Sequence, residues 1–263
     1  MKGAIIGDII GSVYERSNIK TKDFPLFATD ADFTDDTVCT VALAECILDW
    51  GDPSAYLRRW GRRYPDAGYG DRFSEWLWAE QPEPYESFGN GAAMRVSPCA
   101  WLAPTTQEAR SLARAVTQVT HNHPEGMKGA LAVTDVIRLA QRGIRPEVIR
   151  ARVTERYRYD LTCSVDDIRP SYAFDVTCQG TVPPAIVCAL EATGFEDAIR
   201  NAISIGGDSD TLAAITGSIA EAMFGVPDAL WVEAEAYLPD DILAVLERFS
   251  DALTGRFAGG ANR

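Results

Sequence analysis

The sequence predicts an all-α fold folded as one compact multi-helix domain. Apolar residues recur at helical spacing through most of the chain, and no segment alternates apolar and polar residues with any strength. The chain has 263 residues, of which 46% are hydrophobic and 24% charged, and this is enough for one large core. We therefore expect a single domain over residues 1–258 and a flexible tail at residues 259–263.

The composition also disfavours some partners and compartments. The net charge of −13 argues against nucleic acid as a general partner, because binding to phosphate chains normally needs a basic face. The first residues, MKGAIIGDIIGS, break at Asp8 and lack a long apolar run, so we expect neither a signal peptide nor a membrane span. The six cysteines form no CxxC pair, as expected of reduced thiols in a cytoplasmic protein.

The first expected helix, residues 3–14, is apolar almost all round and is therefore expected to be buried. Gly3, Gly7 and Gly11 recur at every fourth position, which favours close packing against another helix and not the GxGxxG of a dinucleotide-binding fold. Glu15 follows this helix, where an acid is poorly placed for the helix dipole. Its carboxylate is expected to be solvated or held by a cation.

The second expected helix begins with Thr-Asp-Asp-Thr, residues 34–37, and ends at Gly51. Acidic residues are electrostatically favoured at such a helix start. Neighbouring residues on a helix diverge by about 100°, so Asp35 and Asp36 are expected to point in different directions. This geometry suits two separate ions, or one ligand and one base, better than a single shared ion.

The middle of the chain is expected to alternate helices with connections that carry candidate residues. The expected helices cover residues 54–64, 106–120, 125–141, 146–157, 181–191 and 195–205, and with 212–224 and 242–257 they make a set of roughly ten. The longest irregular stretch, residues 159–180, is expected to be functional, because long irregular loops in compact domains often are.

Three of these connections are rich in glycine or histidine. Residues 65–70 form a turn-rich loop that contains Gly-Tyr-Gly. Residues 88–95, Phe-Gly-Asn-Gly-Ala-Ala-Met-Arg, open an apolar helix whose backbone N–H groups can cradle phosphate, although such a stretch is more often just a turn and a cap. The only histidines, His121 and His123, lack a further His or Cys partner, so we expect a ligand contact or a satisfied core histidine instead of a transition-metal site.

The stretch Gly206-Gly207-Asp208-Ser209-Asp210-Thr211 lies between two expected helices. The glycines allow a sharp turn, and the carboxylate and hydroxyl oxygens suit a hard cation such as magnesium or calcium. A helix-capping role for Asp208 or Ser209 would explain only one of these oxygens. The DxDxT phosphatase motif does not apply, because it needs a preceding strand and one more residue before the threonine.

The two acidic clusters and Glu15 together supply five carboxylates. If they met in a buried place they would repel strongly, and two divalent cations would nearly neutralise them. The residues therefore favour a dinuclear centre of the magnesium type.

The chain resembles the ADP-ribosylglycohydrolase family, which includes the dinitrogenase-reductase-activating glycohydrolase. The resemblance runs from residue 3 to about residue 224, and its motifs in order are GDIIGSVYE, FTDDT, GYG, FGNGAAMR, THNHPEG, YAFDVTCQGTVPPAI and IGGDSDT. It implies an all-α fold with two Mg²⁺ ions, or Mn²⁺ in their place, held by Thr34, Asp35, Asp36, Asp208, Asp210 and Thr211. It also implies an ADP-ribose cleft lined by Gly68, Tyr69, Gly70, Gly89, Asn90, Gly91 and His121, with Glu15 beside the ions.

The activity that the resemblance implies is hydrolysis of the bond between ADP-ribose and a modified acceptor, most simply a protein arginine. Serine, O-acetyl-ADP-ribose and a nucleic-acid base are alternative acceptors. A non-catalytic ADP-ribose-binding relative would be expected to lose metal ligands, and all are present here; another magnesium-dependent phosphohydrolase would release phosphate instead. Asp36, Glu15 and Asp35 are the candidates to accept a proton from the attacking water.

Overall fold

The computed structural model describes residues 1–259, and the side chains of residues 1–255. The all-α prediction is confirmed: this part of the chain contains fifteen helices, no strand, and one isolated antiparallel bridge between Gly89 and Thr177. The helices are α1 (Lys2–Gly11), α2 (Asp35–Asp49), α3 (Pro53–Arg63), α4 (Asp71–Trp78), α5 (Gly91–Met94), α6 (Ser97–Leu102), α7 (Thr106–Thr117), α8 (Pro124–Gln141), α9 (Pro146–Tyr157), α10 (Val165–Ile168), α11 (Cys178–Leu190), α12 (Phe195–Ser204), α13 (Ser209–Phe224), α14 (Asp228–Glu235) and α15 (Asp240–Gly259).

The number of helices exceeds the roughly ten that the sequence predicts, because short helices escape a periodicity argument. Helices α5, α6 and α10 have only four to six residues each, and α14 has eight. The long expected loop at residues 159–180 contains α10 and also the start of α11. Gly259 is the last residue of α15, and the rest of the expected tail lies outside the described residues.

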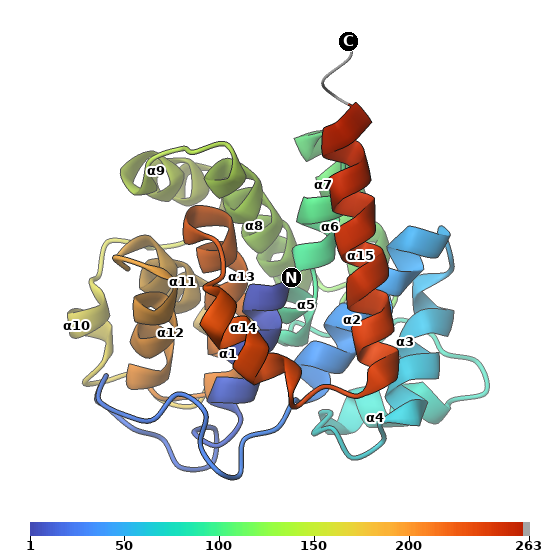
Figure 1. The fold of residues 1–263 in the computed structure, drawn as a ribbon, viewed down its shortest axis with the longest axis horizontal. Coiled ribbons are helices and arrows are strands. Elements are labelled where there is room, and N and C mark those ends of the chain that lie inside the picture. Colours follow the sequence, from blue (N-terminus) through green and yellow to red (C-terminus); the bar gives the residue numbers. More distant parts are fainter. Residues whose placement is uncertain (260–263) are drawn as a thin grey trace.

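Helices α1 and α13 pack closely near the middle of the molecule, with α11 and α12 on one side and α2 and α3 on the other (Figure 1). A Cβ atom on Gly7 would lie 2.0 Å from the carbonyl oxygen of Ala213, and one on Gly11 would lie 2.4 Å from the Cα atom of Asp210. The predicted close packing of the glycine strip is therefore confirmed. It brings the carboxyl end of α1 directly against the amino end of α13.

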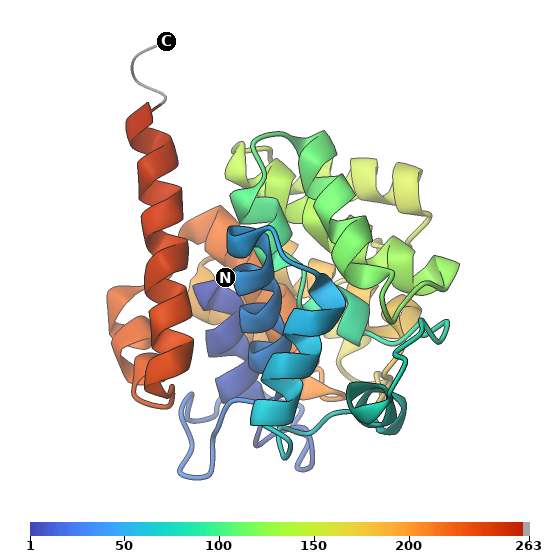
Figure 2. The same cartoon turned by 90° about the vertical axis from the view of Figure 1, so that its right-hand side faces the viewer.

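The remaining helices surround this pair. Helix α8 lies between α7 and α9 and contacts both, while α15 packs along α2 with one end standing clear of the body (Figure 2). Within the described residues, none of the helices has the length and apolar character needed to cross a membrane. All six cysteines are free thiols; Cys163 is exposed and the others are buried.

Candidate metal centre and cleft

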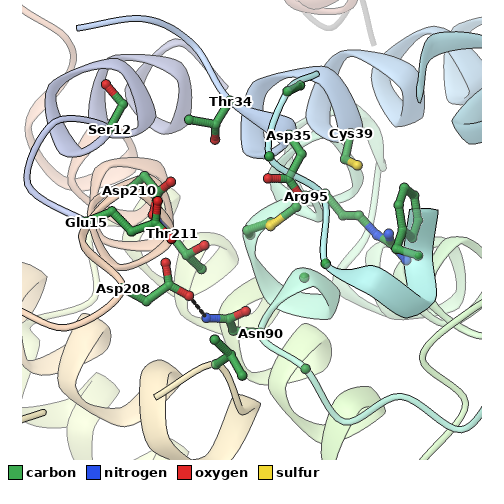
Figure 3. A pocket seen from close by; sticks show the side chains of 18 of the residues that line it. Ser12, Glu15, Thr34, Asp35, Cys39, Asn90, Arg95, Asp208, Asp210 and Thr211 are labelled. Carbon is green, nitrogen blue, oxygen red and sulfur yellow. Dashed lines mark hydrogen bonds between the residues drawn. The ribbon is translucent and has the colours of Figure 1, made fainter. Parts of the chain in front are cut away.

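A cleft of about 840 Å³ opens where the amino ends of α2 and α13 meet. Its walls also include the segment after α1, the loop before α4, the loop that leads into α5, and part of the irregular segment before α11. Figure 3 shows Glu15, Asp208 and Asp210 on one side of this central cleft, with Asp35 and Arg95 on the other.

Two groups of carboxylates lie at the base of the central cleft. Oxygen atoms of Asp8, Asp36 and Asp210 lie within 4.8 Å of one another, and all three side chains are buried. Oxygen atoms of Glu15, Asp208 and Asp210 meet the same limit. Because Asp210 belongs to both groups, the arrangement offers two adjacent cation sites that share one carboxylate.

Asp8 joins α1 to the start of α2. It accepts hydrogen bonds from the backbone N–H groups of Thr34 and Thr37, at 2.9 and 3.1 Å, and from both threonine hydroxyls. Sequence reasoning did not select Asp8 as a site residue. The available signal was an acid in the middle of an otherwise apolar helix, which needs a buried polar partner.

The start of α13 is held in an unusual backbone conformation. Gly206 and Gly207 have φ angles of +70° and +84°, which side chains other than glycine rarely adopt. The Asn18 side chain clamps Gly207 from both sides: its Oδ1 accepts from Gly207 N at 2.6 Å, and its Nδ2 donates to Gly207 O at 2.9 Å. This turn directs Asp208 and Asp210 toward the cleft.

Asp208 occupies the N-cap position of α13 but its side chain makes no capping hydrogen bond. Its Oδ2 accepts instead from Asn90 Nδ2 at 2.7 Å, which links the turn before α13 to the loop before α5. The alternative role as a helix cap therefore does not account for Asp208. Its carboxylate remains available to the cleft.

Asp35 and Asp36 point in different directions, as the helical geometry predicts. Asp36 is buried beneath the cleft, where its Oδ2 accepts from the Thr211 hydroxyl at 3.1 Å. Asp35 lines the cleft and belongs to neither group of clustered carboxylates. Thr34 caps α2 by accepting from Asp36 N at 3.3 Å, while its own hydroxyl donates to Asp8.

The electrostatics of this cluster favour a cation. Burial, followed by the neighbouring carboxylates, raises the pKa values of Asp36 and Asp210 well above the usual range, and burial raises that of Asp8 to about 6. The pKa of Asp35 rises to about 8, from burial and from the charges of Asp8 and Asp208. Asp36 Oδ1 is buried without a hydrogen-bond partner. An all-oxygen donor set with an unsatisfied carboxylate oxygen fits divalent cations of the magnesium type.

Most residues expected on the substrate side do line the central cleft. These residues are Gly68, Gly70, Gly89, Asn90, Gly91 and His121. Tyr69 is not among them: its ring stacks on Phe73 with the centroids 5.4 Å apart, and its hydroxyl is buried without a hydrogen-bond partner. The structure thus places Tyr69 in the packing behind the cleft wall.

A family model described as ADP-ribosylglycohydrolase matches residues 1–260. The chain belongs to this family. A solved structure named as an ADP-ribosylglycohydrolase-related protein complex has the same fold, with a TM-score of 0.72 at 23% identity over 95% of each chain.

Two similar relatives have names that mention activities. The ADP-ribosylhydrolase ARH3 of Mus musculus is 24% identical over 93% of this chain and 88% of its own length. The ADP-ribosylarginine hydrolase Tri1 of Pseudomonas putida is 28% identical over 89% of this chain and 72% of its own length. These relatives support membership in a family of ADP-ribosyl hydrolases, while the two names differ in whether an acceptor is stated.

The central cleft also contains a buried arginine that sequence reasoning missed. The side chain of Arg95 is only 1% exposed, and its Nη2 donates to Thr120 Oγ1 at 2.6 Å and to His121 Nδ1 at 3.3 Å. Because a guanidinium cannot accept, His121 Nδ1 must be the acceptor, and the neutral ring carries its proton on Nε2. A Cβ atom on Gly91 would lie 3.3 Å from Nε2. The His121 N–H therefore faces the glycine loop.

Proposed function

We propose that this chain hydrolyses the bond between ADP-ribose and a protein acceptor, most simply an arginine side chain, with two divalent cations, Mg²⁺ or alternatively Mn²⁺. The observation that carries the proposal is the pair of carboxylate groups that share Asp210 at the base of a cleft of about 840 Å³. That volume is within the range of pockets that enclose small ligands. Family membership supplies the substrate class.

Asp36, Asp208 and Asp210 would hold the cations, with Thr34, Asp35 and Thr211 as further oxygen donors at the same two helix starts. When bound, the cations would supply positive charge that orients ribose hydroxyls and water and makes the water more acidic. Asp8 already accepts four hydrogen bonds from Thr34 and Thr37, so its main contribution is to fix the start of α2.

Glu15 is the proposed acceptor of the proton from water. Glu15 lines the cleft, and its carboxylate belongs to the same cluster as those of Asp208 and Asp210. Burial, and then the charge of Asp208, raises the pKa of Glu15 above its usual range. Of the other two candidates, Asp35 also lines the cleft, whereas Asp36 is covered and does not.

Other residues that line the cleft suit the ADP-ribose moiety. The loop Gly89-Asn90-Gly91 leads into α5 and has His121 Nε2 beneath it, so an imidazole N–H donor faces this loop. The N–H groups of Gly89 and Asn90 already donate to Ser87 Oγ and Val176 O. The Arg95 guanidinium lies on the same side and lacks an ion-pair partner among the described residues. Phe174, which is 55% exposed, offers a flat apolar surface to the adenine. As the bond to the acceptor breaks, the carboxylates would stabilise an oxocarbenium-like ribose.

An arginine acceptor is favoured by the charge around the mouth of the cleft. Four exposed acids, Asp30, Asp32, Asp66 and Asp71, line it, against two exposed arginines, Arg16 and Arg72. The leaving group from ADP-ribosyl-arginine is a guanidinium, and these carboxylates attract such a cation. A serine hydroxyl or an acetyl ester gains no comparable attraction.

The test is a panel of ADP-ribosylated arginine, serine, acetyl ester and guanine substrates, with Mg²⁺ and with EDTA. We expect Mg²⁺-dependent release of free ADP-ribose, fastest from arginine. The double variant Asp208→Ala, Asp210→Ala should lose this activity while its helical circular dichroism is unchanged. Asp66→Asn, which removes one charge from the mouth, should retain Mg²⁺-dependent turnover. Release from no substrate, or full activity in the double variant, would contradict the proposal.

A further inference from the structure

A second cavity, of about 570 Å³, lies over α8 between α7 and α9. None of the residues that line it also lines the central cleft. Figure 1 shows α8 between α7 and α9, the three helices that contribute the lining residues. We call this cavity the α7–α9 groove.

Five arginines converge on the α7–α9 groove, against only two acids, Asp135 and Glu155. The arginines are Arg110, Arg142, Arg152, Arg156 and Arg158. The whole chain carries a net charge of −13, so this local excess of positive charge opposes the overall balance. A site of this kind attracts anions that the rest of the surface repels.

Asp135 contacts two of these arginines at the base of the groove. It is 5% exposed and accepts two hydrogen bonds from Arg110, at 2.7 and 2.8 Å, and one from the Tyr157 hydroxyl at 2.5 Å. Arg156 Nε lies 3.5 Å from its Oδ2. The buried carboxylate thus orients Arg110 by a two-point contact, whereas the side chain of Arg156 is 52% exposed and only lies nearby.

The other three arginines remain uncompensated. The side chains of Arg142, Arg152 and Arg158, all exposed, have neither a hydrogen bond nor an ion pair with the side chains described for residues 1–255. Arg142 and Arg158 sit at helix carboxyl ends, where a cation is favoured by the dipole. That effect does not explain Arg152, which lies within α9, or the convergence of all three on one cavity with Arg110.

We propose that the α7–α9 groove binds a small anion that carries two or more phosphate groups. The planar guanidinium matches phosphate oxygens in pairs, and the uncompensated arginines of α9 and of the carboxyl end of α8 can engage two phosphates at once. The groove volume is in the range of small-ligand sites. The only aromatic residue in the lining is Tyr157, which is buried and bonded to Asp135. Recognition therefore falls on the phosphates and not on a base.

This site is independent of the proposed hydrolase activity, since it shares no residue with the central cleft. The test is a calorimetric titration of the full chain with inorganic pyrophosphate in EDTA. Arg152→Glu and Arg158→Glu should each weaken the binding roughly tenfold or more, because each removes a charged contact and adds a repulsion. Arg114→Glu is the matched control: it makes the same charge change on the exposed face of α7, outside the groove. Its affinity should stay within about twofold of the original.

Three results would overturn the inference. The first is no binding of pyrophosphate. The second is an affinity that Arg152→Glu and Arg158→Glu leave unchanged, which would assign the binding to the central cleft. The third is an equal loss of pyrophosphate affinity in Arg114→Glu, which would attribute the binding to the overall charge of the protein. Orthophosphate should bind at least about tenfold more weakly than pyrophosphate, since it makes one set of contacts; equal affinity would contradict a two-phosphate site.

Discussion

The hydroxyl of Thr211 donates a hydrogen bond to Asp36 Oδ2 at 3.1 Å, although 175 positions separate the two residues. Each lies in the first turn of its helix, and each follows a carboxylate that faces the cleft, Asp35 or Asp210. The contact therefore aligns the two helix starts, and the carboxylate groups at the base of the cleft depend on that alignment. Changes at either helix start should affect both cation sites together.

Cation binding should stabilise the fold. At about 100 times its dissociation constant, Mg²⁺ contributes about 2.7 kcal/mol, which corresponds to a rise in Tm of about 5 °C or more. Asp36→Asn should lose most of this rise, because the amide removes a charge from a group of three buried carboxylates. Differential scanning fluorimetry with Mg²⁺, Mn²⁺ and EDTA measures the rise in Tm of each protein. Asp66→Asn is the control and should keep the full rise in Tm. An unchanged rise in Asp36→Asn would refute the assignment of Asp36 as a cation ligand.

Removal of the Glu15 carboxylate should affect turnover more than binding. We expect Glu15→Gln to lower kcat by about 10² to 10⁴, the usual contribution of a general base, with KM changed only a few-fold. Asp32→Asn, which alters an exposed acid on the wall of the same cleft, is the control and should keep kcat within a few-fold. Steady-state kinetics on ADP-ribosyl-arginine at saturating Mg²⁺ decide the point. A kcat for Glu15→Gln close to the original would assign proton transfer to another group.

A side chain at Gly7 should disrupt the contact between α1 and α13. Its Cβ would lie 2.0 Å from the backbone oxygen of Ala213, which cannot move without shifting the helix. Gly7→Ala should therefore destabilise the protein by about 2 kcal/mol or more, as overpacking does. Gly255→Ala is the matched control: it lies in α15 with no atom nearby, and should stabilise by about 0.5–1 kcal/mol. Urea unfolding measures both, and equal stabilities would contradict the close packing.

His121 should stay neutral where an ordinary histidine takes up a proton. Burial, and then the charges of Arg95 and Arg72, lowers its pKa well below 6.5. Below that pH the unfolded chain binds a proton that the folded chain does not, so stability falls as the pH falls. From pH 6.5 to 5.5 this loss is about 1 kcal/mol.

This loss of stability between pH 6.5 and 5.5 should disappear in His121→Gln, whose side chain does not titrate. Urea unfolding at the two pH values gives the difference between the original protein and the variant. The ring ¹⁵N shifts of His121 should also show a proton on Nε2 throughout. An identical pH dependence in the two proteins would mean that His121 takes up its proton in the folded state.

Much of the fold followed from local pattern. Most of the long helices begin and end within a few residues of the predicted bounds, and α9 matches the predicted 146–157 at both ends, because its apolar stripe and the proline at its start are local features. Helix α14 was missed since its one buried residue, Ala234, gives no stripe to detect. Its stability comes from contacts with α1 that no sequence window contains.

The site was predictable only where acids cluster along the chain. Asp35, Asp36, Asp208 and Asp210 stand out as clusters, whereas Asp8 is a single acid whose partners Thr34 and Thr37 lie 26 and 29 positions away. The same limit applied to the partners of Arg95, which come from the segment that precedes α8. Such side chains acquire a role only through tertiary contacts.

The separation of Asp36 and Thr211 along the chain also has a consequence for protein synthesis. A nascent chain that has emerged from the ribosome only as far as α12 possesses Asp35, Asp36 and Glu15 but lacks Asp208 and Asp210. Helix α1 then has an exposed glycine strip, because the helix that packs on it has not yet been made. Under the proposed function, the protein becomes able to act on its substrate only after the ribosome has translated α13, in one late step.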